Sequence, residues 1–142
     1  MAQSRPPKTP RVLVAEDNSA LRSLMADVLC DEGYEVVEAA DAFELEQAIG
    51  ISTSSGPTEA FDLVVTDIRM PGKSGLDALS ELRRAGSDSR FVVITAFPED
   101  ATERRIRELD AKLLAKPFSL REFRSLMQTI LKPAAPTTGG VA

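Results

Sequence analysis

The sequence predicts an α/β protein, a doubly wound (βα)5 sandwich with a parallel sheet of strand order 2-1-3-4-5. Short apolar runs alternate five times with amphipathic helical patterns, which is typical of parallel sheets covered by helices on both faces. The apolar runs are continuous and do not alternate in polarity, so we expect strands buried on both faces. Right-handed crossovers limit the strand order, and ligands bind where the chain switches direction between the first and third strands.

Each strand is a short aliphatic or β-branched run, and each helix has its own start or stop signal. The strands are expected at residues 11–15, 35–38, 62–67, 91–95 and 112–115. The first helix is expected to begin at Asn18 or Ser19, either of which can cap it, and to stop at Gly33; the second begins with a capping box of Asp41 and Glu44 and reaches residue 49. The third is expected at 76–85 before Gly86, and the fourth at 98–109 with Pro98 in its first turn. The fifth begins with a capping box of Ser119 and Glu122 and carries an apolar stripe that reaches Ile130.

Three segments lack such patterns. Residues 1–10 contain three prolines and are expected to form a flexible arm, and residues 132–142 to form a disordered tail or linker. The domain itself is therefore expected to span residues 11–131. Residues 50–60 carry Gly, Ser, Thr and Pro without periodicity; this segment is long for a helix-to-strand connection and is expected to be mobile.

Composition excludes several functional classes. The 142 residues carry a net charge of −5, which argues against non-specific nucleic-acid binding by the whole surface. One cysteine excludes a disulfide within the chain, which fits a reducing cytoplasm, and no apolar run is long enough for a signal peptide or a membrane span. There is no histidine, so any histidine chemistry must come from a partner.

Chemically active side chains lie at the ends of four of the predicted strands. They are Glu16 and Asp17 directly after the first strand, Asp67 as the last residue of the third, Thr95 as the last residue of the fourth and Lys116 directly after the fifth. In a parallel sheet these ends open on one edge. Three carboxylates repel one another unless a cation is shared, and oxygen ligands suit Mg²⁺.

A metal ion, an ammonium group and a hydroxyl group together neutralise charge on a transferring phosphoryl group. Lys116 supplies the ammonium group and Thr95 the hydroxyl group. Asp67 is the best candidate nucleophile, because it follows an apolar run and precedes a Gly-rich loop that leaves room for a partner.

The order and spacing of four motifs resemble the receiver domain of two-component response regulators, the CheY-like domains with a flavodoxin-like fold. The resemblance covers about residues 11–131. The motifs are the acidic pair Glu16-Asp17, Asp67 followed by Met70-Pro71-Gly72 and Gly75, Thr95-Ala96, and Lys116-Pro117-Phe118.

This resemblance implies a phosphoacceptor. Asp67 would take a phosphoryl group from a histidine kinase or phosphotransfer protein. Lys116 would pair with Asp67 or its phosphoryl group, and Thr95 would reorient to bind it. The family's Lys-Pro bond, here Lys116-Pro117, is often cis. The Mg²⁺ ligands would be Glu16, Asp17, Asp67 and the backbone carbonyl of Arg69.

The sequence departs from the family pattern near the site. Glu16 stands where Asp is more common, and its extra methylene favours metal contact through water. Leu113 replaces the usual aromatic switch residue, so switching is expected to run through backbone movement of the loop at 95–98. Arg69 and Phe97 flank the phosphoryl site, and we hypothesise that Phe97 hinders water and prolongs the phosphorylated state.

Two surfaces are candidate partner sites. By the resemblance, Ala20, Leu21 and Leu24 on the first helix contribute to kinase docking, and residues 98–131 form an output or homodimer surface. The second surface has a basic region, for which the alternative interpretation is a solvated face without a partner. Its members are Arg104, Arg105, Arg107, Lys112, Arg121 and Arg124. No helix-turn-helix follows it, so direct nucleic-acid binding is not expected.

Other functions remain open at this point. The chain could be a phosphorylation-independent, receiver-like scaffold, or a receiver fragment of a larger regulator or hybrid kinase. A flavodoxin-like cofactor binder would have a neutral phosphate loop after the first strand, whereas Glu16-Asp17 there would repel a phosphate without a metal.

Overall fold

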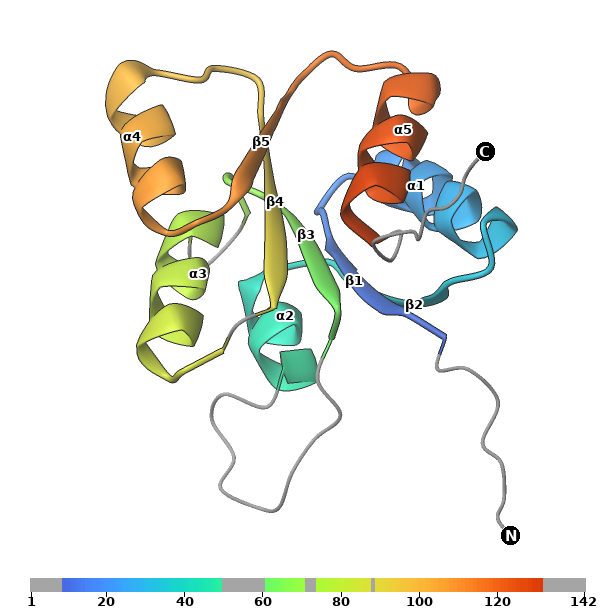
Figure 1. Cartoon of the computed structure of the whole chain (residues 1–142), viewed down its shortest axis with the longest axis horizontal. Helices are drawn as coiled ribbons and strands as arrows, with labels where there is room; N and C mark the ends of the chain where they lie inside the picture. Colours follow the sequence, from blue (N-terminus) through green and yellow to red (C-terminus); the bar gives the residue numbers. More distant parts are fainter. Residues whose placement is uncertain (1–8, 50–60, 71–73, 88, 132–142) are drawn as a thin grey trace, which may run out of the picture.

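The computed structural model describes residues 9–49, 61–70, 74–87 and 89–131 (Figure 1). Within these ranges, five parallel strands form one sheet in the order β2-β1-β3-β4-β5, which confirms the predicted fold class. The strands are β1 (Arg11–Ala15), β2 (Glu35–Ala39), β3 (Leu63–Asp67), β4 (Arg90–Thr95) and β5 (Lys112–Ala115). The helices are α1 (Ser19–Asp31), α2 (Ala42–Ile49), α3 (Gly75–Arg84), α4 (Asp100–Glu108) and α5 (Leu120–Leu131).

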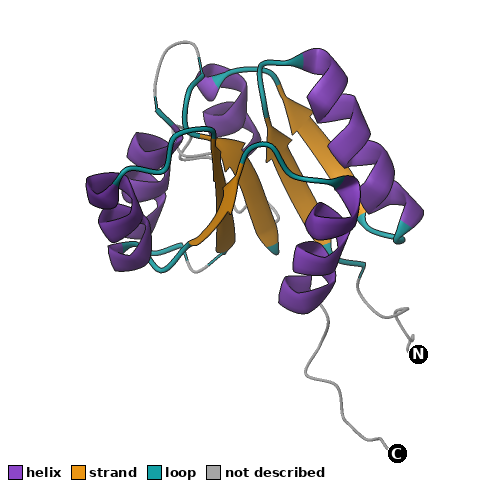
Figure 2. Ribbon diagram, turned by 90° about the horizontal axis from the view of Figure 1, so that it is seen from above, coloured by secondary structure: helices purple, strands orange, loops and turns teal. Residues whose placement is uncertain are grey.

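The helices form a layer on each face of the sheet (Figures 1 and 2). Helices α1 and α5 cover one face, and α2, α3 and α4 cover the other. Alternate strand residues enter opposite cores: Leu13 of β1 packs on the side of α2 and α3, whereas Val12 and Val14 pack on the side of α1 and α5. Both faces of β1 are therefore buried, which explains its continuous apolar sequence.

The signals predicted for the end of α1 and for the starts of α2 and α5 are found in the structure. The N–H group of Glu44 donates to Asp41 Oδ1 at 2.8 Å. In the second capping box, the N–H of Glu122 donates to Ser119 Oγ at 3.0 Å, and the N–H of Ser119 donates back to Glu122 Oε1 at 2.8 Å. Gly33, after α1, has a φ of +93°, a backbone conformation that other residues rarely adopt.

The start of α4 was predicted wrongly. Pro98 was expected in its first turn, but the helix begins at Asp100 with Glu99 as an extended N-cap. The N–H of Glu103 donates to the carbonyl of Glu99 at 2.8 Å as the first helical bond. Asp100 and Glu103 then place negative charge at the positive end of the helix dipole, which favours a start two residues after the proline.

Several predictions concern segments outside the described residues. These are most of the arm at 1–10, the connection at 50–60, Pro71 and Gly72 of the second motif, and the tail at 132–142. Among the helices of the described ranges, none has the length and apolar character needed to cross a bilayer.

Candidate phosphoacceptor site

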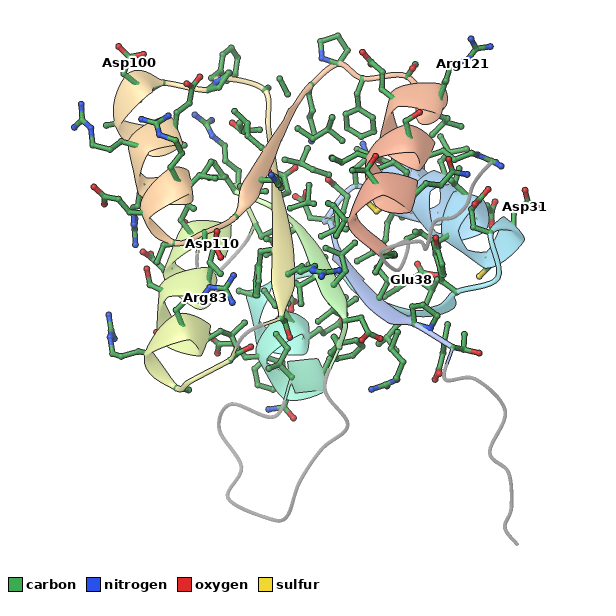
Figure 3. The ribbon with its side chains drawn as sticks, in the orientation of Figure 1. Asp31, Glu38, Arg83, Asp100, Asp110 and Arg121 are labelled. Atoms are coloured by element: carbon green, nitrogen blue, oxygen red, sulfur yellow. The ribbon has the colours of Figure 1, made fainter. Side chains whose placement is uncertain are left out.

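The carboxyl ends of four strands bring the predicted site residues to one edge of the sheet. Glu16 and Asp17 follow β1, Asp67 is the last residue of β3, Thr95 is the last of β4, and Lys116 follows β5. Helices α4 and α5 begin at the same edge, as the labelled Asp100 and Arg121 show in Figure 3. The parallel sheet thus assembles side chains that lie up to a hundred residues apart in the sequence.

Three acids form a compact cluster at this edge. One carboxylate oxygen from each of Glu16, Asp17 and Asp67 lies within 4.8 Å of the others. Glu16 is 1% exposed and Asp67 6% exposed, whereas Asp17 is open to solvent. Such a cluster can hold a metal ion, because a cation offsets the repulsion among the carboxylates.

Lys116, which follows β5, reaches the acids across the end of β4. Its Nζ lies 2.6 Å from Asp67 Oδ2 and 3.5 Å from Glu16 Oε1. Partial burial alone would lower the pKa of Lys116, but the hydrogen bond to Asp67 and the charges of Asp67 and Glu16 outweigh it, so the pKa is raised. The ammonium group therefore stays charged beside Asp67 at neutral pH.

Glu16 is the most buried acid of the cluster. Its Oε2 accepts from the N–H group of Asn18 at 3.1 Å. Its buried Oε1 finds no hydrogen-bond partner among the described residues, although the Lys116 ammonium lies 3.5 Å away as an ion-pair partner. Burial raises the pKa of Glu16 to about 7, and the nearby Asp67 adds to the shift. An additional cation at the cluster would satisfy this oxygen and favour the ionised carboxylate.

Asp67 is held by the backbone around it. The N–H group of Arg69 donates to its Oδ1 at 2.9 Å, while Lys116 binds its Oδ2. Its carbonyl oxygen accepts from the hydroxyl of Thr66 at 3.0 Å. Gly75 packs against this carbonyl so closely that a Cβ there would lie 2.5 Å from it. Both carboxylate oxygens are thus oriented before any ligand binds.

Thr95 joins the site through its backbone. Its carbonyl accepts from the N–H of Lys116 at 2.8 Å, and its hydroxyl accepts from the N–H of Phe97 at 3.1 Å. The structure therefore places Thr95 at the predicted edge, with its hydroxyl turned toward its own loop. Leu113, in the position of the family's aromatic switch residue, is partly buried against the core on the side of α2, α3 and α4.

Arg69 and Phe97, the two residues that flank the site in the sequence, contact each other. The guanidinium carbon of Arg69 lies 5.7 Å from the centre of the Phe97 ring, within the range of a cation–π interaction. The Phe97 ring is 67% exposed. This contact joins the loop after β3 to the loop after β4.

One contact at the site was missed by sequence reasoning. Arg22 of α1 donates from one terminal nitrogen to the backbone carbonyl of Glu16 at 2.7 Å and from Nε to Glu38 Oε1 at 3.1 Å. No motif identifies it, since an arginine in a helix is ordinary. Its only signal is a positive charge in the first turn of α1, where the helix dipole disfavours it.

The basic region predicted on α4, β5 and α5 is partly neutralised. Arg105 pairs with Asp77 of α3 at 3.0 Å, and Arg124 pairs with Asp31 of α1 and with Glu32 directly after it at 3.4 and 2.8 Å. These two arginines tie helices together. The remaining basic residues of the region are exposed; they are Arg104, Arg107, Lys112 and Arg121.

Comparison with known proteins agrees with this geometry. The family model for the response regulator receiver domain matches residues 12–128. The chain belongs to this family. The resemblance drawn from the four motifs is therefore confirmed, and the acidic cluster of the receiver domain lies where its strands β1 and β3 end.

The curated relatives differ in how much of their length this chain covers. The receiver domain is 38% identical over 114 residues to the transcriptional regulatory protein PdtaR of Mycobacterium tuberculosis, with 79% of this chain and 52% of that protein covered. It is 30% identical over 122 residues to the sporulation initiation phosphotransferase F of Bacillus subtilis, with 85% and 93% covered. The chain thus spans about half the length of PdtaR and nearly all of the second relative.

Solved structures show the same fold. The non-phosphorylated HemR receiver domain of Leptospira biflexa superposes with a TM-score of 0.77 at 29% identity, covering 92% of this chain and all of that one. The receiver domain of the hybrid histidine kinase CckA superposes with a TM-score of 0.65 at 28% identity, covering 86% and 99%.

Proposed function

We propose that this receiver domain accepts a phosphoryl group on Asp67 from the phosphohistidine of a kinase or phosphotransfer protein. The observation that carries the proposal is the 2.6 Å contact between Lys116 and Asp67 beside the cluster of three acids. These 142 residues contain no histidine, so the phosphohistidine donor lies outside them. A carboxylate oxygen of Asp67 attacks phosphorus, the P–N bond breaks, and the histidine leaves with the bonding electron pair.

Mg²⁺ is the metal that fits this cluster. The donors are carboxylate oxygens, and Glu16 Oε1 is a buried oxygen without a hydrogen-bond partner among the described residues. We infer that Glu16, Asp17, Asp67 and the backbone carbonyl of Arg69 hold the ion. When bound, Mg²⁺ supplies positive charge that neutralises the oxygens of the transferring phosphoryl group.

The protein's own groups prepare Asp67 for this transfer. Lys116 offsets the negative charge on Asp67 Oδ2. Its ammonium group ends a flexible side chain, so it can move to bind the phosphoryl oxygens as negative charge develops on them. The N–H of Arg69 fixes Asp67 Oδ1. Together they hold the nucleophile in one orientation, which lowers the entropic cost of reaching the transition state.

The response to phosphorylation is proposed to begin at Thr95. Its hydroxyl exchanges the bond with the Phe97 N–H for one to the phosphoryl group, which moves the loop between β4 and α4. Leu113 lacks the polar tip of a tyrosine, so the signal runs through this backbone movement.

The partners and location are part of the same proposal. The donor docks on the exposed part of α1 that carries Ala20 and Leu24, with Leu21 at its partly buried margin. The output or homodimer surface is formed by α4, β5 and α5, and the protein acts in the cytoplasm.

The direct test is phosphorylation with acetyl phosphate and Mg²⁺. The wild-type chain should gain the mass of one phosphoryl group, and Asp67→Asn should not. Asp77→Asn is the matched control, since Asp77 is an exposed acid of α3 whose ion pair with Arg105 lies outside the cluster. Equal phosphorylation of wild type and Asp67→Asn would refute the assignment of the acceptor.

A further inference from the structure

We propose that Arg22 is a positioning residue for the metal-binding acid pair and that it sets the affinity of the site for Mg²⁺. The inference rests on the proposed Mg²⁺ site and goes beyond it, because Arg22 contacts no phosphoryl group or metal ligand atom. It acts through the backbone that carries Glu16 and Asp17.

The guanidinium of Arg22 bridges three elements. It leaves the first turn of α1, donates to the carbonyl of Glu16 at 2.7 Å, and reaches Glu38 of β2 at 3.1 Å. Glu38 is labelled on its strand in Figure 3. The Arg22 side chain is 18% exposed, so its bond to the Glu16 carbonyl forms in a partly desolvated setting where it is stronger than at an open surface. Glu38, in contrast, is exposed.

The bonded carbonyl belongs to the peptide that joins Glu16 to Asp17. This peptide is planar, so the direction of its carbonyl fixes the orientation of the whole unit. The N–H of Glu16 is held in turn by the carbonyl of Ala39 at 3.0 Å. Arg22 therefore restricts the directions in which both acidic side chains leave the backbone, and these directions set the spacing of the carboxylates.

The position of Arg22 has a local cost that its contacts explain. A positive side chain in the first turn of a helix opposes the helix dipole, and α1 has no acidic residue in that turn to offset it. A residue that breaks a local preference in this way is expected to have a compensating role. The two hydrogen bonds to Glu16 and Glu38 provide one.

Electrostatic repulsion by Arg22 would change the Mg²⁺ affinity in the opposite direction to positioning. The charge of Arg22 would repel a cation at the site, and its removal would then tighten Mg²⁺ binding. The ion pair with Glu38 at 3.1 Å offsets much of this repulsion. Residues that orient metal ligands typically change affinity by about 10- to 100-fold, whereas exposed ion pairs contribute little. Positioning is therefore expected to dominate.

The test is calorimetric titration of the full chain with Mg²⁺. Arg22→Met keeps the apolar stem and removes the donors, and its Mg²⁺ affinity should fall about tenfold. Arg22→Lys keeps one charged donor and should recover most of the affinity. Glu38→Gln removes the ion pair but leaves the bond to the Glu16 carbonyl, and its affinity should stay within about twofold of wild type.

Arg124→Ala is the matched control for stability. It removes another arginine that ties α1 to a neighbouring element, at Asp31 and Glu32, away from the acids. Its unfolding midpoint in urea should fall while its Mg²⁺ affinity stays at the wild-type value. Should Arg22→Met fail to fold, Arg22→Gln repeats the comparison with the same expected loss of affinity.

The outcomes separate the two proposals. If the wild-type chain does not bind Mg²⁺, the proposed metal site itself is wrong. If the wild type binds Mg²⁺ and the neutral Arg22 variants bind it equally well or more tightly, the positioning role is wrong. Weaker binding by Glu38→Gln than by Arg22→Met would likewise overturn it, since charge compensation would then set the affinity.

Discussion

Gly75 packs closely against the backbone of Asp67. A Cβ at this position would lie 2.5 Å from the Asp67 carbonyl oxygen and 2.9 Å from the Thr66 hydroxyl. The first of these atoms is backbone and cannot rotate away. The glycine therefore lets the start of α3 approach the end of β3, and this approach fixes the backbone that carries the phosphoacceptor.

We predict that Gly75→Ala lowers the free energy of unfolding by about 1–3 kcal/mol, because α3 must move away from β3. Urea denaturation measures the change. Gln47→Ala, at an exposed position of α2, should have little effect. A Gly75→Ala protein as stable as wild type would show that the contact relaxes without cost.

Phe97 and Arg69 meet beside the site from two different loops. A cation–π contact at an exposed position is worth about 0.5–1 kcal/mol. If the pair hinders the approach of water to the phosphoryl group, Phe97→Ala should speed dephosphorylation by about two- to fivefold. The measurement is the decay of the phosphorylated chain after removal of the phosphodonor.

Phe43→Ala is the matched control for this prediction. Phe43 is as exposed as Phe97, 68% against 67%, but it lies on α2. Its removal should leave the decay rate unchanged. Equal half-lives of the phosphorylated Phe97→Ala and wild-type chains would show that the Arg69–Phe97 contact does not slow dephosphorylation.

At the scale of elements, the helices differ in how firmly they are attached. Helix α4 buries only Ile106 within its described length, whereas α3 buries five residues. The ion pair of Arg105 with Asp77 supplements this weak apolar contact. A helix with little buried area can shift at low cost, which suits α4 as part of the proposed output surface.

Helix α1 carries the proposed docking surface for the phosphodonor. Leu24 is 47% exposed, while Met25 beside it is fully buried. Leu24→Asp should therefore leave the fold intact. It should slow phosphotransfer from a phosphorylated partner by about tenfold, as expected for the loss of about 1.4 kcal/mol of binding free energy.

The kinetics distinguish docking from chemistry. Phosphorylation of Leu24→Asp by acetyl phosphate should match that of wild type, since the small donor needs no docking surface. Gln47→Asp introduces the same charge on the other face of the sheet and should not slow either reaction. An unchanged rate with the partner would exclude Leu24 from the docking surface.

At the scale of the whole molecule, Glu16 links the site to global stability. Its pKa in the folded protein is about 7 against an ordinary value of 4.5, so the folded state binds the proton more tightly than the unfolded state. The contribution of Glu16 to stability is therefore fully present below pH 4.5. This contribution is lost as the pH rises from 4.5 to about 7. Above pH 7 the titration of Glu16 changes the stability no further.

We predict that, without metal, the stability of wild type relative to Glu16→Gln falls by up to about 3 kcal/mol between pH 4.5 and 7. Urea denaturation of both proteins across this range measures the difference. Saturating Mg²⁺ should flatten the curve, because a bound cation favours the ionised carboxylate. A difference independent of pH would show that Glu16 titrates normally in the folded chain.

Much of this architecture follows from the sequence. The positions of all five strands, the strand order, the Asp41 cap and the Ser119–Glu122 capping box were predicted, because apolar periodicity and short-range capping are local properties of the chain. The side chain of Glu44 accepts from the N–H of Ala40 and not from that of Asp41, so the first capping box is only half formed. The edge at which Glu16, Asp67 and Lys116 meet was predicted as well, since parallel strands align their carboxyl ends. The start of α4 was wrong, because proline fits both inside and just before a helix.

The sequence by itself determined which residues reach the site. The tertiary structure alone decided how they are held there. The closeness of Gly75 to Asp67, the bond from Arg22 to the Glu16 carbonyl, the unsatisfied oxygen of Glu16 and the contact of Arg69 with Phe97 depend on distances of a few ångströms between separate elements. The hydrophobic pattern sets the order and facing of elements, but only the packed core sets those distances.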